Sequence, residues 1–170
     1  MKTNYIKKIL GLSIFLIGSM AFSQDAVKNN KLAFNSFSVT PLEVYFTDYS
    51  GGVAITGELG YKIGRNILTL SGSYGEEFVI WGNPDTFQQL NILYGREFEI
   101  LNHFFIDTHG GLGMFRFKDE DYTKISVGIP LVCKMRYKTG DKFSIGLKFQ
   151  VNVNSVKNIY SAGILLQWNY

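Results

Sequence analysis

Residues 124–170 alternate between apolar and small or polar residues, and this period of two constrains the fold more than any other feature of the chain. Successive side chains of an extended strand point to opposite faces, so the pattern predicts three strands with unlike faces. Long strands with one apolar and one small, polar face are typical of a transmembrane β-barrel. The apolar faces consist of Ile125, Val127, Ile129, Leu131, Cys133, Met135 and Tyr137, then Phe143, Ile145, Leu147, Phe149 and Val151, then Tyr160, Ala162, Ile164, Leu166, Trp168 and Tyr170.

The first 23 residues have the order of a secretory signal peptide. Three lysines precede an apolar stretch over 9–20 that is too short to span a bilayer, and Ala21-Phe22-Ser23 fits the small-x-small rule for cleavage before Gln24. We therefore expect 1–23 to be a cleavable signal peptide that directs export through the Sec pathway. The residue directly after the expected cleavage site is Gln24 and not cysteine, so a lipid-anchored lipoprotein is not expected.

Cleavage would remove the basic character of the chain. Three of the 17 Lys and Arg residues lie in 1–23 and none of the 14 Asp and Glu residues does, so the remainder carries 14 of each and no formal net charge. A nucleic-acid-binding surface and a polybasic membrane patch are not expected at this balance. Cys133 is the single cysteine and falls on an apolar face, which makes an internal disulfide impossible and a packed wall residue the expectation.

The residues after the signal peptide predict one domain of eight strands. A short periplasmic segment over 24–33 would precede a barrel over 34–170. Tight turns are expected at 64–66, 99–103 and 139–141, and longer loops at 48–52, 81–85, 118–122 and 154–158, which places both termini in the periplasm. The expected strands are 34–47, 53–63, 66–80, 86–98, 104–117, 123–138, 142–153 and 159–170.

Alternation alone does not say which face lies inside, so a soluble, lipocalin-like barrel is the alternative. A water-facing exterior would favour charged residues, whereas small residues suit the interior of a narrow barrel. The polar faces carry the small residues Ala54, Gly60, Gly95, Gly111, Gly113, Ser126, Gly128, Ser144, Gly146, Ser161 and Gly163. The apolar faces carry aromatic residues near the strand ends, where interfacial girdles belong: Tyr61, Tyr74, Tyr94, Phe98, Phe104, Tyr137, Phe143, Trp168 and Tyr170. These compositions favour the membrane barrel.

The chain ends on Leu166, Trp168 and Tyr170 at alternate positions. In this ending and in its strand pattern the whole mature chain resembles the small outer-membrane β-barrel proteins of Gram-negative bacteria, whose terminal aromatic signal is read by the barrel-insertion machinery. The resemblance implies an outer-membrane location, escort by periplasmic chaperones, and contact with outer-membrane lipids and lipopolysaccharide. It does not imply a shared activity.

Charged residues on the inward parity form the main candidate site. Charges in a narrow lumen are costly unless they are paired, so we expect a network of ion pairs that plugs the barrel rather than an open channel. A narrow ion path or small-solute conduit is the alternative. No cofactor or metal ion is expected. The candidate residues are Glu43, Glu58, Glu97, Asp107, His109, Lys124, Lys134, Arg136 and Lys148.

His109 and Asp107 share one face, and Ser126 or Ser144 would approach from neighbouring strands, which raises a second alternative, a lipid A-modifying acyl hydrolase or acyltransferase. The His-x-Ser motif of barrel-type lipid A deacylases does not occur here. These residues would also point into a filled lumen. A packed interior histidine is therefore the favoured interpretation.

Two prolines fall within expected strands. The apolar parity shifts by one residue at Pro41, which predicts a β-bulge, whereas Pro130 causes no shift and should leave one gap in the hydrogen-bond ladder. The functional alternative is a lateral opening for lipid, as proposed for barrel-type lipid A palmitoyltransferases.

The third expected strand continues into an apolar tip, Phe78, Val79, Ile80 and Trp81, followed by a turn. Exposed apolar residues above a membrane often mark a contact site, although these could also cover the barrel mouth. The acidic loop 118–121 has no calcium-binding spacing.

Taken together, these features of the sequence favour a monomeric barrel with a structural, envelope-anchoring or surface-interaction role.

Overall fold

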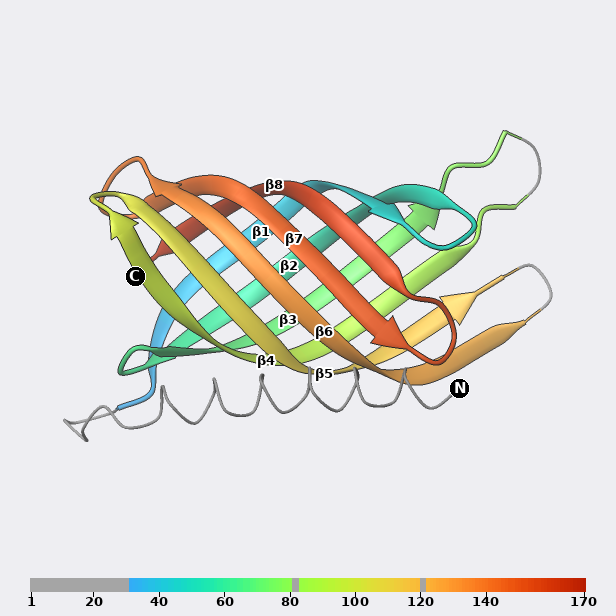
Figure 1. Ribbon diagram of the computed structural model, residues 1–170, viewed down its shortest axis with the longest axis horizontal. Coiled ribbons are helices and arrows are strands. Elements are labelled where there is room, and N and C mark those ends of the chain that lie inside the picture. The colour runs from blue at the N-terminus through green and yellow to red at the C-terminus, as the bar shows by residue number, and fades with distance from the viewer. Residues whose placement is uncertain (1–30, 81–82, 120–121) are drawn as a thin grey trace, which may run out of the picture. The chain divides into compact units, whose positions relative to one another are not determined.

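The computed structural model describes residues 31–80, 83–119 and 122–170. Within them, eight antiparallel strands follow one another around a closed barrel, and the first pairs with the last (Figure 1). The predicted eight-stranded barrel is confirmed. The strands are β1 (Ala33–Phe46), β2 (Gly51–Ile63), β3 (Asn66–Glu77), β4 (Thr86–Leu101), β5 (Phe104–Lys118), β6 (Thr123–Lys138), β7 (Phe143–Asn154) and β8 (Ile159–Asn169).

Both ends of the barrel segment lie at one end of the barrel, together with the β2–β3, β4–β5 and β6–β7 connections (Figure 1). We call this the turn end, and the opposite end, with the other four connections, the loop end. Among the described residues, no helix is long and apolar enough to cross a membrane. The signal peptide predicted over 1–23 lies outside the described residues and stays a prediction.

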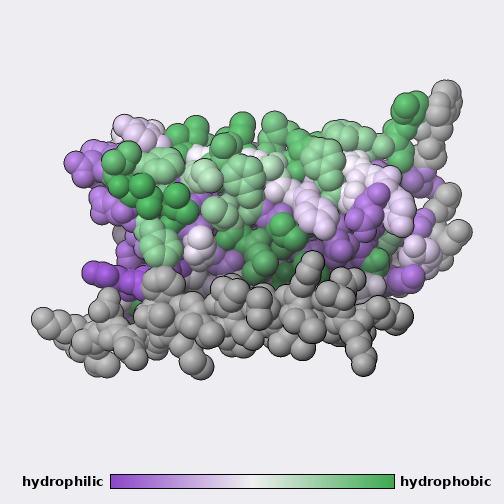
Figure 2. Space-filling model, viewed as in Figure 1, coloured by the Kyte–Doolittle hydropathy of each residue, from purple (hydrophilic) through white to green (hydrophobic). Residues whose placement is uncertain are grey.

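The outer face of the barrel is apolar around its middle. Hydrophobic side chains cover most of the visible outer surface between the two ends, and hydrophilic ones gather toward the ends (Figure 2). Ile164 and Leu147 are opposite each other on β8 and β7 and are both about half exposed, at 45% and 48%. Most inward positions are small, polar or charged, and a smaller set of buried aliphatic and aromatic side chains, such as Leu93 and Phe115, lies among them. This distribution is the reverse of that of a soluble barrel with an apolar centre.

Pro41 lies in a bulge of β1, as the parity shift predicts. Thr40 and Pro41 on β1 stand opposite the single residue Leu165 on β8. The extra residue lets outward side chains continue on the outer face, so Val39 before the bulge and Leu42 after it share that face. At Pro130 the β5–β6 register continues without a shift, but the residue pairs between Gly110 and Gly113 are missing from the ladder. The expected local gap is therefore present.

The third strand is shorter than the sequence predicts. β3 ends at Glu77, whose amide donates to the carbonyl of Asp85 at 2.9 Å, and the next amide, of Phe78, donates to the carbonyl of Gly51 at 3.0 Å. These bonds end the ladder and direct the chain into the β3–β4 loop. The strand predicted to reach residue 80 is corrected, because apolar composition alone cannot show where pairing partners end.

We expect Ile164→Arg to lower the free energy of unfolding by about 2 to 4 kcal/mol, because a cation would enter the apolar middle of the lipid-facing surface. Equilibrium denaturation in phospholipid vesicles measures this. The matched control is Gln88→Arg, which adds the same side chain to an outward position near the loop end and should cost about 0 to 1 kcal/mol. Equal costs for the two variants would contradict a lipid-facing belt.

Candidate functional site

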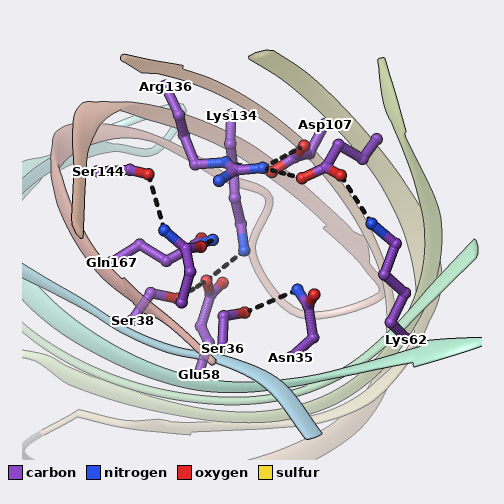
Figure 3. A network of polar contacts seen from close by, with 12 residues as sticks. Asn35, Ser36, Ser38, Glu58, Lys62, Asp107, Lys134, Arg136, Ser144 and Gln167 are labelled. Atoms are coloured by element: carbon purple, nitrogen blue, oxygen red, sulfur yellow. Dashed lines mark hydrogen bonds and ion pairs between the residues drawn. The ribbon is translucent and has the colours of Figure 1, made fainter. Parts of the chain in front are cut away.

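The turn end of the lumen is occupied by a four-residue ion-pair chain. Arg136 donates through Nε and Nη2 to both carboxylate oxygens of Asp107, at 2.6 and 2.9 Å, and through Nη2 to Oε2 of Glu97 at 2.6 Å. Lys62 donates to the other oxygen of Glu97 at 3.0 Å. Figure 3 shows Arg136 beside Asp107 on one side of the lumen, with Lys62 approaching from another part of the wall. Paired geometry of this kind makes strong, directional contacts.

The middle of the lumen holds a second charged group centred on Glu58. Lys134 Nζ lies 2.5 Å from Oε2 of Glu58, and Ser38 donates to the same oxygen at 3.1 Å. Lys148, which is fully buried, places its Nζ 3.8 Å from Oε1 of Glu58 and 3.6 Å from Oε2 of Glu43. A buried ammonium group thus lies between two carboxylates that come from β2 and β1.

Glu43 completes the charged interior. It accepts hydrogen bonds from Thr56 Oγ1 at 2.6 Å and from Ser161 Oγ. The carboxylates and cations of the interior balance to zero formal charge, as is expected in a narrow lumen that holds little water. The carboxylates are Glu43, Glu58, Glu97 and Asp107, and the cations are Lys62, Lys134, Arg136 and Lys148.

The membership of this network differs from the sequence interpretation at two positions. Lys124 was expected inside, but it is exposed at the loop end of β6, with Nζ 4.5 Å from the ring centroid of Tyr122. The strand end lies at the rim of the barrel there, so a long side chain of inward parity can reach solvent. Lys62 takes part instead. Lys62 has the inward parity of β2, which is the sequence signal for its place in the network. Because it lies near the strand end, this parity alone did not identify it as an interior residue.

His109 lies against Gly95 on the lumen wall, where a Cβ on the glycine would come within 2.4 Å of the imidazole ring. Its two ring nitrogens have no hydrogen-bond partner among the described residues. Beside it is a polar cavity of about 10 Å³, lined by Asp107, Lys134 and Thr69 among others. That volume suits about one water molecule, and a water there could bind the imidazole.

The groups of the hydrolase alternative are not brought together. The Asp107 carboxylate is engaged by Arg136, while Ser126 bonds Ser155 near the loop end at 2.9 Å and Ser144 accepts from Asn169 at 3.0 Å. Among the described residues, no group of three His, Cys, Asp or Glu side chains could hold a metal ion.

Four aromatic rings close the lumen near the loop end. Tyr45, Phe87, Phe115 and Phe117 point inward and are at most 5% exposed, and we call them the aromatic plug. Phe87 stacks on Phe115 at 6.0 Å between centroids and meets Tyr45 edge-on at 4.8 Å. Its ring rests on Gly75, where any Cβ would clash. Sequence reasoning missed the plug, although apolar residues at inward positions of two neighbouring strands were the signal.

The β7–β8 loop covers the plug. Val156 packs against the plug, and Lys157 places Nζ 4.6 Å from the ring centroid of Phe117 and 3.5 Å from Oδ2 of Asp85 in the β3–β4 loop. Asn154 Oδ1 fixes this loop by accepting from the amides of Val156 and Lys157. Partial burial, together with the nearby Asp119 and Glu77 carboxylates, raises the pKa of Asp85, and Lys157 opposes that rise.

The predicted contact loop is exposed in the part that the structure describes. Phe78, Val79 and Ile80 are 67%, 42% and 91% exposed, and Trp81 lies outside the described residues. At the turn end, Trp168 contacts the rings of Phe37 and Phe143, with centroids 5.9 and 5.3 Å away.

The rest of the terminal pattern lies on the same outer face. Tyr170 packs on Phe34 at 5.1 Å between ring centroids, and Leu166 stands opposite Val39 of β1. The C-terminal residues thus join an aromatic girdle around the turn end. Their role as an insertion signal stays a prediction.

We expect Arg136→Met to lower the free energy of unfolding by about 3 to 5 kcal/mol, because Asp107 and Glu97 would keep buried charges without their shared partner. Denaturation in detergent micelles measures the loss. Lys142→Met, in the exposed β6–β7 turn, is the control and should change stability little. Adding Asp107→Asn and Glu97→Gln to Arg136→Met should restore part of the loss. No loss in the single variant would contradict a stabilising network.

No protein-family model and no curated protein matches this chain. Solved structures do. Neisserial surface protein A is 7% identical, with a TM-score of 0.63 over 81% of this chain and 97% of that chain. The N-terminal β-barrel domain of OprF of Pseudomonas aeruginosa is 14% identical, with a TM-score of 0.54 over 82% of this chain and 100% of that chain. Ail, the attachment invasion locus protein of Yersinia pestis, is 11% identical, with a TM-score of 0.52 over 82% of this chain and 99% of that chain. The chain has the fold of the small outer-membrane β-barrels.

Proposed function

We propose that this protein is a closed outer-membrane barrel that conducts no solutes and acts through its surfaces, by anchoring in the envelope and presenting its loops outward. The observation that carries this proposal is the filling of the lumen. The charged network occupies its turn end and middle, and the aromatic plug with the β7–β8 loop occupies its loop end.

A filled lumen disfavours the conduit alternative on energetic grounds. An ion that passed Arg136 and Lys148 would have to separate these residues from their buried carboxylate partners. Each separated pair would leave buried charges without compensation. It would then have to displace the Phe87–Phe115 stack. The lipid-modifying alternative has no observation in its favour, because Asp107 is held by Arg136 rather than by His109.

The surface that remains for interaction lies at the loop end. Phe78 and Ile80 on the β3–β4 loop and Tyr49 on the β1–β2 turn, at 93%, are strongly exposed. The hydrogen bond from the Phe78 amide to Gly51 holds the two connections together. Apolar side chains that face water in this way suit contact with a partner surface. The name of Ail, which describes attachment and invasion, is in keeping with such a role for a barrel of this fold.

The other partners that we propose act during export and insertion of the barrel. The signal peptide expected over 1–23 would direct export. The short segment 24–33 would then lie in the periplasm, ahead of the barrel over 34–170. The girdle residues Trp168 and Tyr170 would present the terminal signal to the insertion machinery after chaperone escort. We expect a monomer that is surrounded by outer-membrane lipids and lipopolysaccharide.

The proposed orientation is tested by cysteine labelling on intact cells. In a Cys133→Ser background, a membrane-impermeant maleimide should label Ser155→Cys in the β7–β8 loop and should leave Thr139→Cys in the β6–β7 turn unlabelled until the outer membrane is opened. Labelling of Thr139→Cys alone on intact cells would contradict the orientation.

Planar-bilayer recordings test closure of the lumen. We expect no stepwise conductance from the purified wild-type protein. The Phe87→Ala, Phe115→Ala double variant should also be silent, because the ion-pair chain still closes the turn end. Steps from the wild type would contradict the proposal and favour the conduit. Steps from the double variant alone would show that the charged network does not seal the lumen.

A further inference from the structure

Two cations lie on the lipid-facing side of β5 at the loop end. Phe115 and Phe117 point into the lumen, so Arg116 and Lys118 alternate with them and point outward, where both are exposed. Two residues of a strand separate them by about 7 Å on one face. Among the described residues, neither side chain has a hydrogen bond or an ion pair, in contrast to the cations of the lumen.

Hydrogen-bonding side chains flank both cations in the sheet register. Arg116 lies between Gln88 of β4 and the apolar Ile125 of β6, and Lys118 lies between Thr86 of β4 and Thr123 of β6. The outward carboxylate of this row, Glu76, is one strand further away, opposite Thr86. The direct cross-strand partners of Arg116 and Lys118 are therefore uncharged, and these partners leave both cations available to an anion.

An apolar wall lies directly below these cations. The next outward row toward the turn end consists of Leu90, Met114 and Val127, in register with one another and 52%, 54% and 72% exposed. A soluble anion would satisfy the cations but not this wall. A molecule with an anionic head and hydrocarbon chains would satisfy both.

The opposite side of the barrel lacks this arrangement. There the outward positions nearest the loop end are apolar or aromatic: Phe46 of β1, Val153 of β7 and Tyr160 of β8, all exposed. Phe46 and Tyr160 are direct partners in the register. The cationic pair thus marks one side of the lipid-facing surface, over β4, β5 and β6.

We propose that Arg116 and Lys118 bind the phosphate group of an outer-leaflet lipid whose acyl chains lie on Leu90, Met114 and Val127. The guanidinium group matches two phosphate oxygens, and the ammonium group adds a second charge to the same headgroup. Basic residues at the boundary of a membrane surface are suited to lipid headgroups. This inference rests on the proposed orientation, which places the loop end in the outer leaflet.

Native mass spectrometry of the intact, detergent-solubilised protein tests the proposal, with diphosphoryl lipid A as the probe. We expect Arg116→Gln, Lys118→Gln to reduce the bound fraction at least tenfold. Each matched control, Lys124→Gln at the loop end and Lys142→Gln at the turn end, should retain wild-type binding. Heat-modifiable migration in gels confirms that each variant is folded.

Two further arms identify the source of the phosphate. Excess inorganic phosphate should not displace diphosphoryl lipid A from the wild type, and zwitterionic phosphatidylcholine should be retained at least tenfold less. Equal lipid A binding by the double variant, or displacement by inorganic phosphate, would overturn the inference. Because Ser155→Cys labelling reports orientation independently, a correctly oriented barrel with unchanged lipid A binding would refute this site and leave the proposed function intact.

Discussion

The hydrocarbon that surrounds the barrel determines the rest of the structure. Backbone groups find partners only by closing the sheet, so β1 pairs with β8 and no strand edge remains within the described barrel. The outward parity is then apolar, and every charge in the middle of the strands must point inward. A narrow lumen offers such charges little water, which is why Glu43, Glu58, Lys134 and Lys148 lie in pairs.

The lumen of the closed barrel is filled in two different ways. Near the turn end, Arg136 of β6 reaches carboxylates on β5 and β4, and in the middle Lys134 crosses the lumen to reach Glu58 on β2. Near the loop end, aromatic rings fill the space, with Gly75 providing the room that Phe87 needs. Both arrangements close the barrel. The structure therefore directs attention away from the lumen and toward the loops and the lipid-facing surface.

Much of this arrangement could be predicted from the sequence. Strand number, the bulge at Pro41 and the inward position of Arg136 follow from a period of two, since parity is a local property. Three features did not follow. The end of β3 at Glu77 depends on hydrogen bonds to other segments, and Lys124 is exposed because it lies at the rim of the barrel. The plug ring of Phe115 lies in a stretch where both parities contain large apolar residues.

Spin-label accessibility in bilayers tests most directly whether hydrocarbon bathes the apolar face. Nitroxides at Leu147→Cys and Ile164→Cys, in a Cys133→Ser background, should collide frequently with oxygen dissolved in the membrane and rarely with a water-soluble nickel chelate. This result would place the two positions, which face each other in the register, against lipid tails. Labels that collide preferentially with the chelate, or that are shielded from both reagents, would contradict the account.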